Sequence, residues 1–185
     1  MSGHVVLVNS NDEAQGTAEK LRAHNEGWLH RALSVFVFDD EGRLLLQQRA
    51  PDKYHSGGLW SNPCCSPPYP DEQPLVAARR RLHEEMGFSC ALTPAFHFTY
   101  EASVGPSLTE HEYDHVFVGT VGEATIRPAP EEVADWEWVS PSFVRKDVAT
   151  HPDRYTVWFR RLLDRTLNEA PAVAPSPTEP ASSPS

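Results

Sequence analysis

The chain has 185 residues, of which 39% are hydrophobic and 23% charged. This length and composition are close to those of an ordinary single globular domain. Its formal net charge of −10 argues against binding to nucleic acid or to an anionic membrane surface, although a small pocket can still be locally basic. The sequence contains neither a long apolar run that predicts a membrane span nor a signal-peptide pattern. Three cysteines are too few for a disulfide framework, so a reduced, cytoplasmic protein is expected.

The first third of the chain predicts short strands around one short helix. Strands are expected over residues 5–8, 32–38 and 43–48, and a helix over 17–23. The second and third strands flank a turn at 39–42, where Gly42 suits a positive φ. The stretch 51–70 is rich in Pro, Gly and Ser and is predicted to be a long loop. Loops of that length in compact domains are usually functional.

The remaining elements predict a sheet with helices on both sides. A helix is expected over residues 75–86 with Gly87 as its C-terminal cap, and another begins at Ser140 with Pro141 in its first turn. Further strands are expected over 95–100, 111–120 and 135–139, and a last helix over 155–167. This order predicts an α/β (α+β) fold in one domain over 1–168, with a mixed β-sheet between helices. The Pro/Ala/Ser-rich segment 169–185 is predicted to be a disordered tail.

Charged residues on the helix over 75–86 have two readings. Arg81 and Glu85 are four residues apart and therefore share one helix face. They are either an ion pair on a solvated helix or a magnesium-binding carboxylate beside an arginine that binds phosphate.

A second group of polar residues lies on the strand over 111–120 and just before it. If this stretch is extended, Glu110 and Glu112 lie on one face and His111 on the other. Two adjacent carboxylates are costly unless a cation or proton is shared, so the alternatives are a solvent-facing strand and a metal site. His24 and His30, on either side of Trp28, are either surface residues or imidazole ligands that converge with them.

The loop over 51–70 contains two adjacent thiols. Cys64 and Cys65 follow a Trp60-Ser61-Asn62 sequence. Free cysteines are usually small buried hydrophobic residues, but in a Pro/Gly-rich loop one of them is a candidate reactive group.

Taken together, these motifs resemble type 1 isopentenyl-diphosphate isomerase, a family of the Nudix fold superfamily. The resemblance runs from about His4 to about Leu163 and is carried by residues 52–56, 58–62, 64–65, 80–87 and 110–119. It implies a Nudix-like domain that converts isopentenyl diphosphate to dimethylallyl diphosphate, for isoprenoid precursor synthesis, by adding one proton and removing another. The implied partner is this small substrate, and a monomer is expected.

The resemblance also implies roles for individual residues. The implied catalytic residues are Cys65 and Glu112 as the acid–base pair, Tyr100 beside the catalytic carboxylate and Trp158 over the hydrocarbon. The implied diphosphate-binding residues are Lys20, Arg49, Lys53 and Arg81. The implied ligands of a catalytic Mn²⁺, Mg²⁺ or Zn²⁺ ion are His24, His30, Glu110 and Glu112, and Glu85 would hold a Mg²⁺ ion that also contacts the diphosphate.

Two departures from family patterns define the alternatives. Pro67 stands where the isomerase family has a third histidine ligand, and Cys64 is a nearby candidate to compensate. Loss of that ligand is consistent with a catalytically weakened paralogue that only binds prenyl diphosphates. A Nudix-type pyrophosphohydrolase is the other alternative, but Arg81 replaces the first glutamate of the Arg-Glu-x-x-Glu-Glu helix such enzymes use. That change favours binding a diphosphate over cleaving it.

Overall fold

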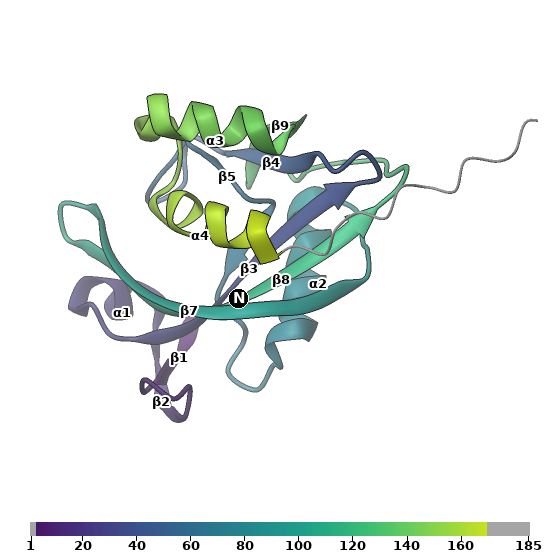
Figure 1. Cartoon of the computed structure of the whole chain (residues 1–185). Coiled ribbons are helices and arrows are strands. Elements are labelled where there is room, and N and C mark those ends of the chain that lie inside the picture. Colours follow the sequence, from purple (N-terminus) through teal and green to yellow (C-terminus); the bar gives the residue numbers. More distant parts are fainter. Residues whose placement is uncertain (1–2, 170–185) are drawn as a thin grey trace, which may run out of the picture.

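The computed structural model describes residues 3–169, and the segments 1–2 and 170–185, including nearly all of the predicted tail, lie outside the described residues. The strands of this part are β1 His4–Val8, β2 Ala14–Glu19, β3 His30–Asp39, β4 Leu44–Arg49, β5 Trp60–Ser61, β6 Cys64–Ser66, β7 Leu92–Gly105, β8 Leu108–Val121 and β9 Val133–Val139. The helices are α1 Lys20–Glu26, α2 Pro74–Met86, α3 Pro141–Thr150 and α4 Val157–Glu169, with a 3-10 turn at Pro152–Arg154. The strands form one mixed sheet (Figure 1).

β3 is the central strand of this sheet. One of its edges pairs in parallel with β8, from His30 opposite Glu112 to Asp39 opposite Val121. Its other edge pairs in succession with β1, β6 and β4, all antiparallel. Most of β3 is buried, which explains why its sequence is a nearly continuous apolar run rather than an alternating one.

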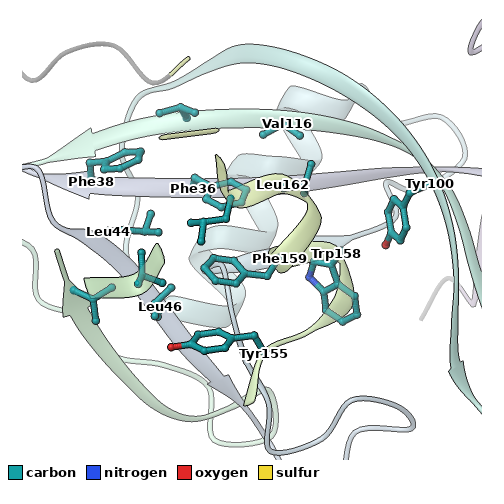
Figure 2. Close-up of a cluster of buried hydrophobic side chains, with 14 of the residues drawn as sticks. Phe36, Phe38, Leu44, Leu46, Tyr100, Val116, Tyr155, Trp158, Phe159 and Leu162 are labelled. Atoms are coloured by element: carbon teal, nitrogen blue, oxygen red, sulfur yellow. The ribbon is translucent and has the colours of Figure 1, made fainter. Parts of the chain in front are cut away.

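Helices cover both faces of the sheet, as predicted. α2 and α4 lie on opposite faces of the sheet (Figure 1). On β3, Phe36 and Phe38 pack in the cluster with α4, whereas Val35 and Val37 pack in the cluster with α2. Figure 2 shows Phe159 of α4 packed among side chains of the sheet, and its ring stacks on Phe36 at a centroid distance of 6.1 Å. The predicted fold class is therefore confirmed.

β7 and β8 form a hairpin longer than the predicted strands. They pair antiparallel from Leu92 opposite Gly119 to Gly105 opposite Leu108, with two irregularities in register. One end of the hairpin lies beside α1 (Figure 1). This extension brings the first residues of β8 close to the helix that carries His24.

Two local predictions were wrong. Residues 17–19 of the predicted helix belong instead to β2, because they pair with β1. The helix α1 begins only at Lys20, where the Glu19 carboxylate accepts hydrogen bonds from the first turn. The predicted loop over 51–70 contains β5 and β6, because Cys64–Ser66 pairs with residues 33–35 of β3. The strands β2, β5 and β6 form by pairing with β1, β4 and β3, and a local sequence pattern does not reveal such pairing.

The other predicted elements were confirmed within a few residues. Gly87 caps α2 in the left-handed conformation at φ 72°, and the Ser140 hydroxyl accepts a hydrogen bond from the amide of Phe143 at the start of α3. None of the helices in residues 3–169 has the length and apolar character needed to cross a membrane.

Candidate active site

A pocket of about 50 Å³ opens where α1, α2 and α4 approach the sheet and the loop before β5. Its lining residues are Lys20, His24, Arg49, Lys53, Tyr54, His55, Cys65, Ser66, Pro67, Arg81, Glu85, Glu110, Glu112, Glu132 and Trp158. Of the predicted site residues, all but Tyr100 and His30 contribute to this lining. Those two lie directly behind it, in contact with the carboxylates described below.

Two buried carboxylates form the centre of the pocket. Glu110 and Glu112 are only 4% and 3% exposed, and the two-residue period of β8 places both on the pocket side. The Tyr100 hydroxyl lies between them, 2.6 Å from Glu110 Oε2 and 2.9 Å from Glu112 Oε2. Burial and the neighbouring charge of Glu110 raise the pKa of Glu112. Burial also opposes ionisation of Glu110, but His55, Tyr100 and His24 together outweigh it and lower the pKa of that carboxyl.

His24 and His30 face these carboxylates from α1 and the start of β3. Their Nδ1 atoms lie 2.7 Å and 2.8 Å from the carbonyl oxygens of Lys20 and Trp28. Because a carbonyl only accepts, each Nδ1 donates, and each Nε2 is left unprotonated in the neutral ring. The Nε2 atoms lie 3.9 Å from Glu110 and 3.6 Å from Glu112.

A third histidine completes this cluster. His55, in the loop before β5, places its Nε2 2.9 Å from Glu110 Oε1. Sequence reasoning missed it as a site residue, although it belongs to the 52–56 segment that carried the family resemblance. The sequence feature that could have indicated it is its position two residues after Lys53, which was predicted to bind the diphosphate. In the structure, Lys53 and His55 line the same pocket.

Cys65 and Cys64 point to opposite faces of the sheet because they are consecutive residues of β6. Cys65 lines the pocket, and its sulfur lies within 4.8 Å of carboxylate oxygens of Glu112 and Asp114. Burial and the charge of Glu112 raise the pKa of the Cys65 thiol, which favours the protonated form. Cys64 packs in the apolar cluster under α2, so it does not provide the compensating ligand considered for Pro67.

Asp114 was not predicted as a site residue, although it follows Glu112 by one strand period. It is fully buried, and the hydroxyl of Ser34 donates to its Oδ2 at 2.7 Å. Burial and the charge of Glu112 raise its pKa well above the usual range. The three acidic residues of β8 therefore form a row along one face of the strand, ending beside Cys65.

Basic side chains from four segments surround the rest of the pocket: Lys20, Arg49, Lys53 and Arg81. Arg81 pairs with Glu85 at 2.7 Å, and Lys53 pairs with Glu132, an acidic lining residue that the sequence analysis missed. The buried Nε atoms of Arg49 and Arg81 have no hydrogen-bond partner among residues 3–169. Such unpaired donors are typical of a site that binds an anion.

Trp158 supplies the apolar surface of the pocket. It is one of the largest fully buried side chains of α4, and Figure 2 shows it beside Phe159 at the edge of the core. Its ring meets His55 edge-on at 5.8 Å, and the Arg49 guanidinium lies 5.3 Å from its centroid. An indole in this position can stabilise positive charge in a bound molecule.

Comparison with known proteins agrees with the fold and the site. The NUDIX domain family matches residues 28–161. A crystal structure of DR0079 from Deinococcus radiodurans superposes with a TM-score of 0.71 at 20% identity, covering 88% of this chain and 98% of that one. The chain therefore belongs to the NUDIX family.

Two curated relatives narrow the assignment. Isopentenyl-diphosphate Delta-isomerase 2 of Aromatoleum aromaticum is 49% identical over 169 residues, covering 91% of this chain and 88% of the relative. Isopentenyl-diphosphate Delta-isomerase of Burkholderia multivorans is 49% identical over 165 residues, covering 89% and 93%. Within the NUDIX family, the chain belongs to the isopentenyl-diphosphate Delta-isomerases.

Proposed function

We propose that this protein isomerises isopentenyl diphosphate to dimethylallyl diphosphate, with Cys65 and Glu112 as the acid–base pair. The observation that carries this proposal is that both groups line one pocket, next to a tryptophan and within reach of four basic side chains. The family membership supports the same reaction. We also propose that the protein acts as a monomer in the cytoplasm, which agrees with the three free thiols.

The reaction demands what these residues offer. A proton added to the terminal carbon of the alkene leaves positive charge on the tertiary carbon, and a base then removes a proton from the neighbouring carbon. A thiol with a raised pKa holds a proton to deliver, and an ionised carboxylate can accept one. Trp158 would stabilise the positive charge, and closure of the pocket would keep water from adding to it.

The donor set around Glu110 and Glu112 fits a divalent metal. The buried Nε2 of His30 has no hydrogen-bond partner in the described part of the chain. Donor atoms of His24, His30 and Glu112 lie within 4.8 Å of one another, as ligands of a single ion do. Imidazole and carboxylate together suit Zn²⁺ or Mn²⁺, with Mg²⁺ as the third candidate. When bound, such an ion would neutralise the paired carboxylates and polarise the groups it touches.

A second ion is proposed at Glu85. This carboxylate is buried and lines the pocket, where it pairs with Arg81. The same arginine also lies 3.6 Å from Glu132. Mg²⁺ prefers a site with one or two carboxylates, several waters and substrate phosphate oxygens. Glu85 would therefore hold Mg²⁺ against the diphosphate, which Lys20, Arg49, Lys53 and Arg81 position without taking part in the bond changes.

Lys20→Met is expected to raise the KM for isopentenyl diphosphate by about 10- to 100-fold with little change in kcat, because a charge-assisted hydrogen bond to the diphosphate is lost. Lys20 forms no salt bridge with any residue between 3 and 169, so its ammonium is available to an anion. Steady-state kinetics and competitive inhibition by inorganic pyrophosphate measure the effect. Arg22→Met, an exposed cation on the same helix, is the matched control. Equal KM values in the two variants would contradict this role.

Tyr100→Phe is expected to lower kcat by about 10- to 100-fold and to leave KM nearly unchanged, because only the hydrogen bonds to the two carboxylates are removed. Tyr100 does not line the pocket, so it is a positioning residue. Tyr113→Phe, on the adjacent strand, is the control. A parallel rise in KM, or an unchanged kcat, would show that Tyr100 does not act through the carboxylates.

Product analysis separates the proposed isomerase from the two alternatives. Purified protein with Mg²⁺ is incubated with isopentenyl diphosphate, and dimethylallyl diphosphate, phosphate and pyrophosphate are quantified. Isomerised product without released phosphate is the expected result. Released phosphate or pyrophosphate would favour a pyrophosphohydrolase, and binding without turnover would favour a prenyl-diphosphate-binding protein.

A further inference from the structure

Three imidazoles, rather than two, converge on the paired carboxylates. His24, His30 and His55 are 1%, 0% and 7% exposed, and they come from α1, β3 and the loop before β5. The ring centroids of His24 and His30 are 4.9 Å apart, and those of His24 and His55 are 6.1 Å apart. Two successive elements of the chain and a later loop are thus folded so that their histidines meet.

His55 is oriented like the other two histidines. Its Nδ1 lies 3.2 Å from the hydroxyl of Ser56, and its Nε2 faces Glu110. Anchoring of one ring nitrogen by a neighbouring oxygen, with the other directed at a shared centre, is the usual arrangement of metal-binding histidines. His24 and His30 have the same arrangement, with backbone carbonyls as the anchors.

The donor atoms form two overlapping groups with ligand spacing. One group is His24, His55 and Glu110, and the other is His24, His30 and Glu112, and in each the donor atoms lie within 4.8 Å of one another. Because His24 belongs to both groups, the two groups adjoin each other and together contain five residues. A simple His55–Glu110 ion pair accounts for only two of these donors and leaves the buried His30 Nε2 without a partner among residues 3–169.

The loop that carries His55 is held in a narrow range of conformations. Ser56 has φ 53° and Gly58 φ 78°, both in the left-handed region, and a Cβ on Gly57 would lie 2.3 Å from the carbonyl oxygen of Pro51. Arg49 donates to the carbonyl oxygen of His55 at 3.3 Å. The imidazole is buried and meets the Trp158 ring edge-on, so neighbouring groups support both its backbone and its ring.

We propose that His55 is the third imidazole ligand of the divalent metal held by His24, His30, Glu110 and Glu112. This inference rests on the metal site of the proposed function. It explains how the site keeps three nitrogen donors although Pro67, which lines the same pocket, has no group that binds a metal. The ligand comes from the loop before β5 instead of from the segment after Cys65. Three nitrogens with carboxylate oxygen favour Zn²⁺ or Mn²⁺ over Mg²⁺ at this centre.

The test counts nitrogen ligands and measures metal affinity without using activity. Metal-free protein is titrated with Mn²⁺, and pulsed electron paramagnetic resonance resolves couplings to imidazole nitrogen. Three such couplings are expected in the wild-type protein and two in His55→Gln. The Kd for Mn²⁺ is expected to rise in His55→Gln and His55→Ala by at least the roughly 10- to 100-fold that follows loss of a residue supporting a ligand.

His83→Ala is the matched control, because His83 is an exposed histidine of α2 remote from the cluster, and its Kd is expected to equal the wild-type value. Circular dichroism verifies that each variant is folded. If His55→Ala does not fold, His55→Gln still tests the inference, because glutamine preserves most of the side-chain volume. An unchanged nitrogen count and Kd in His55→Gln would overturn the inference, as would a wild-type protein with only two nitrogen couplings.

The inference and the proposed function fail in different ways. Three nitrogen couplings in a protein that does not isomerise isopentenyl diphosphate would support the ligand and reject the enzyme. An active isomerase with only two couplings would retain the enzyme and reject His55 as a ligand.

Discussion

Cys65→Ala is expected to lower kcat for isomerisation by about 10²- to 10⁴-fold, the usual contribution of a positioned general acid or base. The side chain faces the pocket rather than the core, so the variant should fold normally and retain a KM close to that of the wild type. Steady-state conversion of isopentenyl diphosphate measures kcat and KM, and thermal unfolding measures whether the variant is folded.

Cys90→Ala is the control for this experiment. Cys90 is also a free thiol, but it lies in the cluster on the α2 face of the sheet, away from the pocket. We expect the activity of this variant to match that of the wild type. A Cys65→Ala enzyme with a kcat near the wild-type value would mean that another group donates or accepts that proton.

Glu112→Gln is expected to reduce kcat by about 10²- to 10⁴-fold or more, because the amide is neither a base nor an acid at this position. The same change removes a proposed metal ligand, so the metal content of the purified protein should also fall. Elemental analysis of the variant alongside its kinetics distinguishes the two effects.

Glu101→Gln provides the comparison for this change. Glu101 is on β7, opposite His111 in the hairpin, and is exposed. Its neutralisation should change neither kcat nor metal content. Full metal occupancy together with an unimpaired rate in Glu112→Gln would remove Glu112 from both proposed roles.

Residues whose arrangement follows from a local period were the most predictable part of the site. Glu110 and Glu112 share the pocket side of β8, and the ring of His111 lies elsewhere, 2.9 Å from the carbonyl oxygen of Gly27. Arg81 and Glu85 likewise meet at 2.7 Å, as their spacing on a helix predicts. Their catalytic and ligand roles stay predictions.

Features that depend on long-range pairing were not predictable in the same way. The strand β6 exists because it pairs with β3, and this pairing determines which of the two adjacent cysteines faces the pocket. His55 lies in a loop without periodicity, and its approach to Glu110 joins residues 55 positions apart in the sequence. Only the three-dimensional arrangement shows that it belongs with His24 and His30.

The family resemblance therefore identified most of the pocket residues, but it assigned no role to His55, which we propose as a metal ligand. Pro67 alone gave the impression of a weakened site. The position of His55 provides a physical reason to expect an intact one, with the same number of nitrogen donors supplied by a different segment.

Incubation with isopentenyl diphosphate in deuterated water, followed by nuclear magnetic resonance of the product, tests proton addition by the buried thiol and carboxylate most directly. The wild-type enzyme should form dimethylallyl diphosphate with solvent deuterium in the methyl group made from the former alkene terminus. Dimethylallyl diphosphate without deuterium at that carbon would contradict the mechanism, and intact isopentenyl diphosphate would contradict the reaction itself.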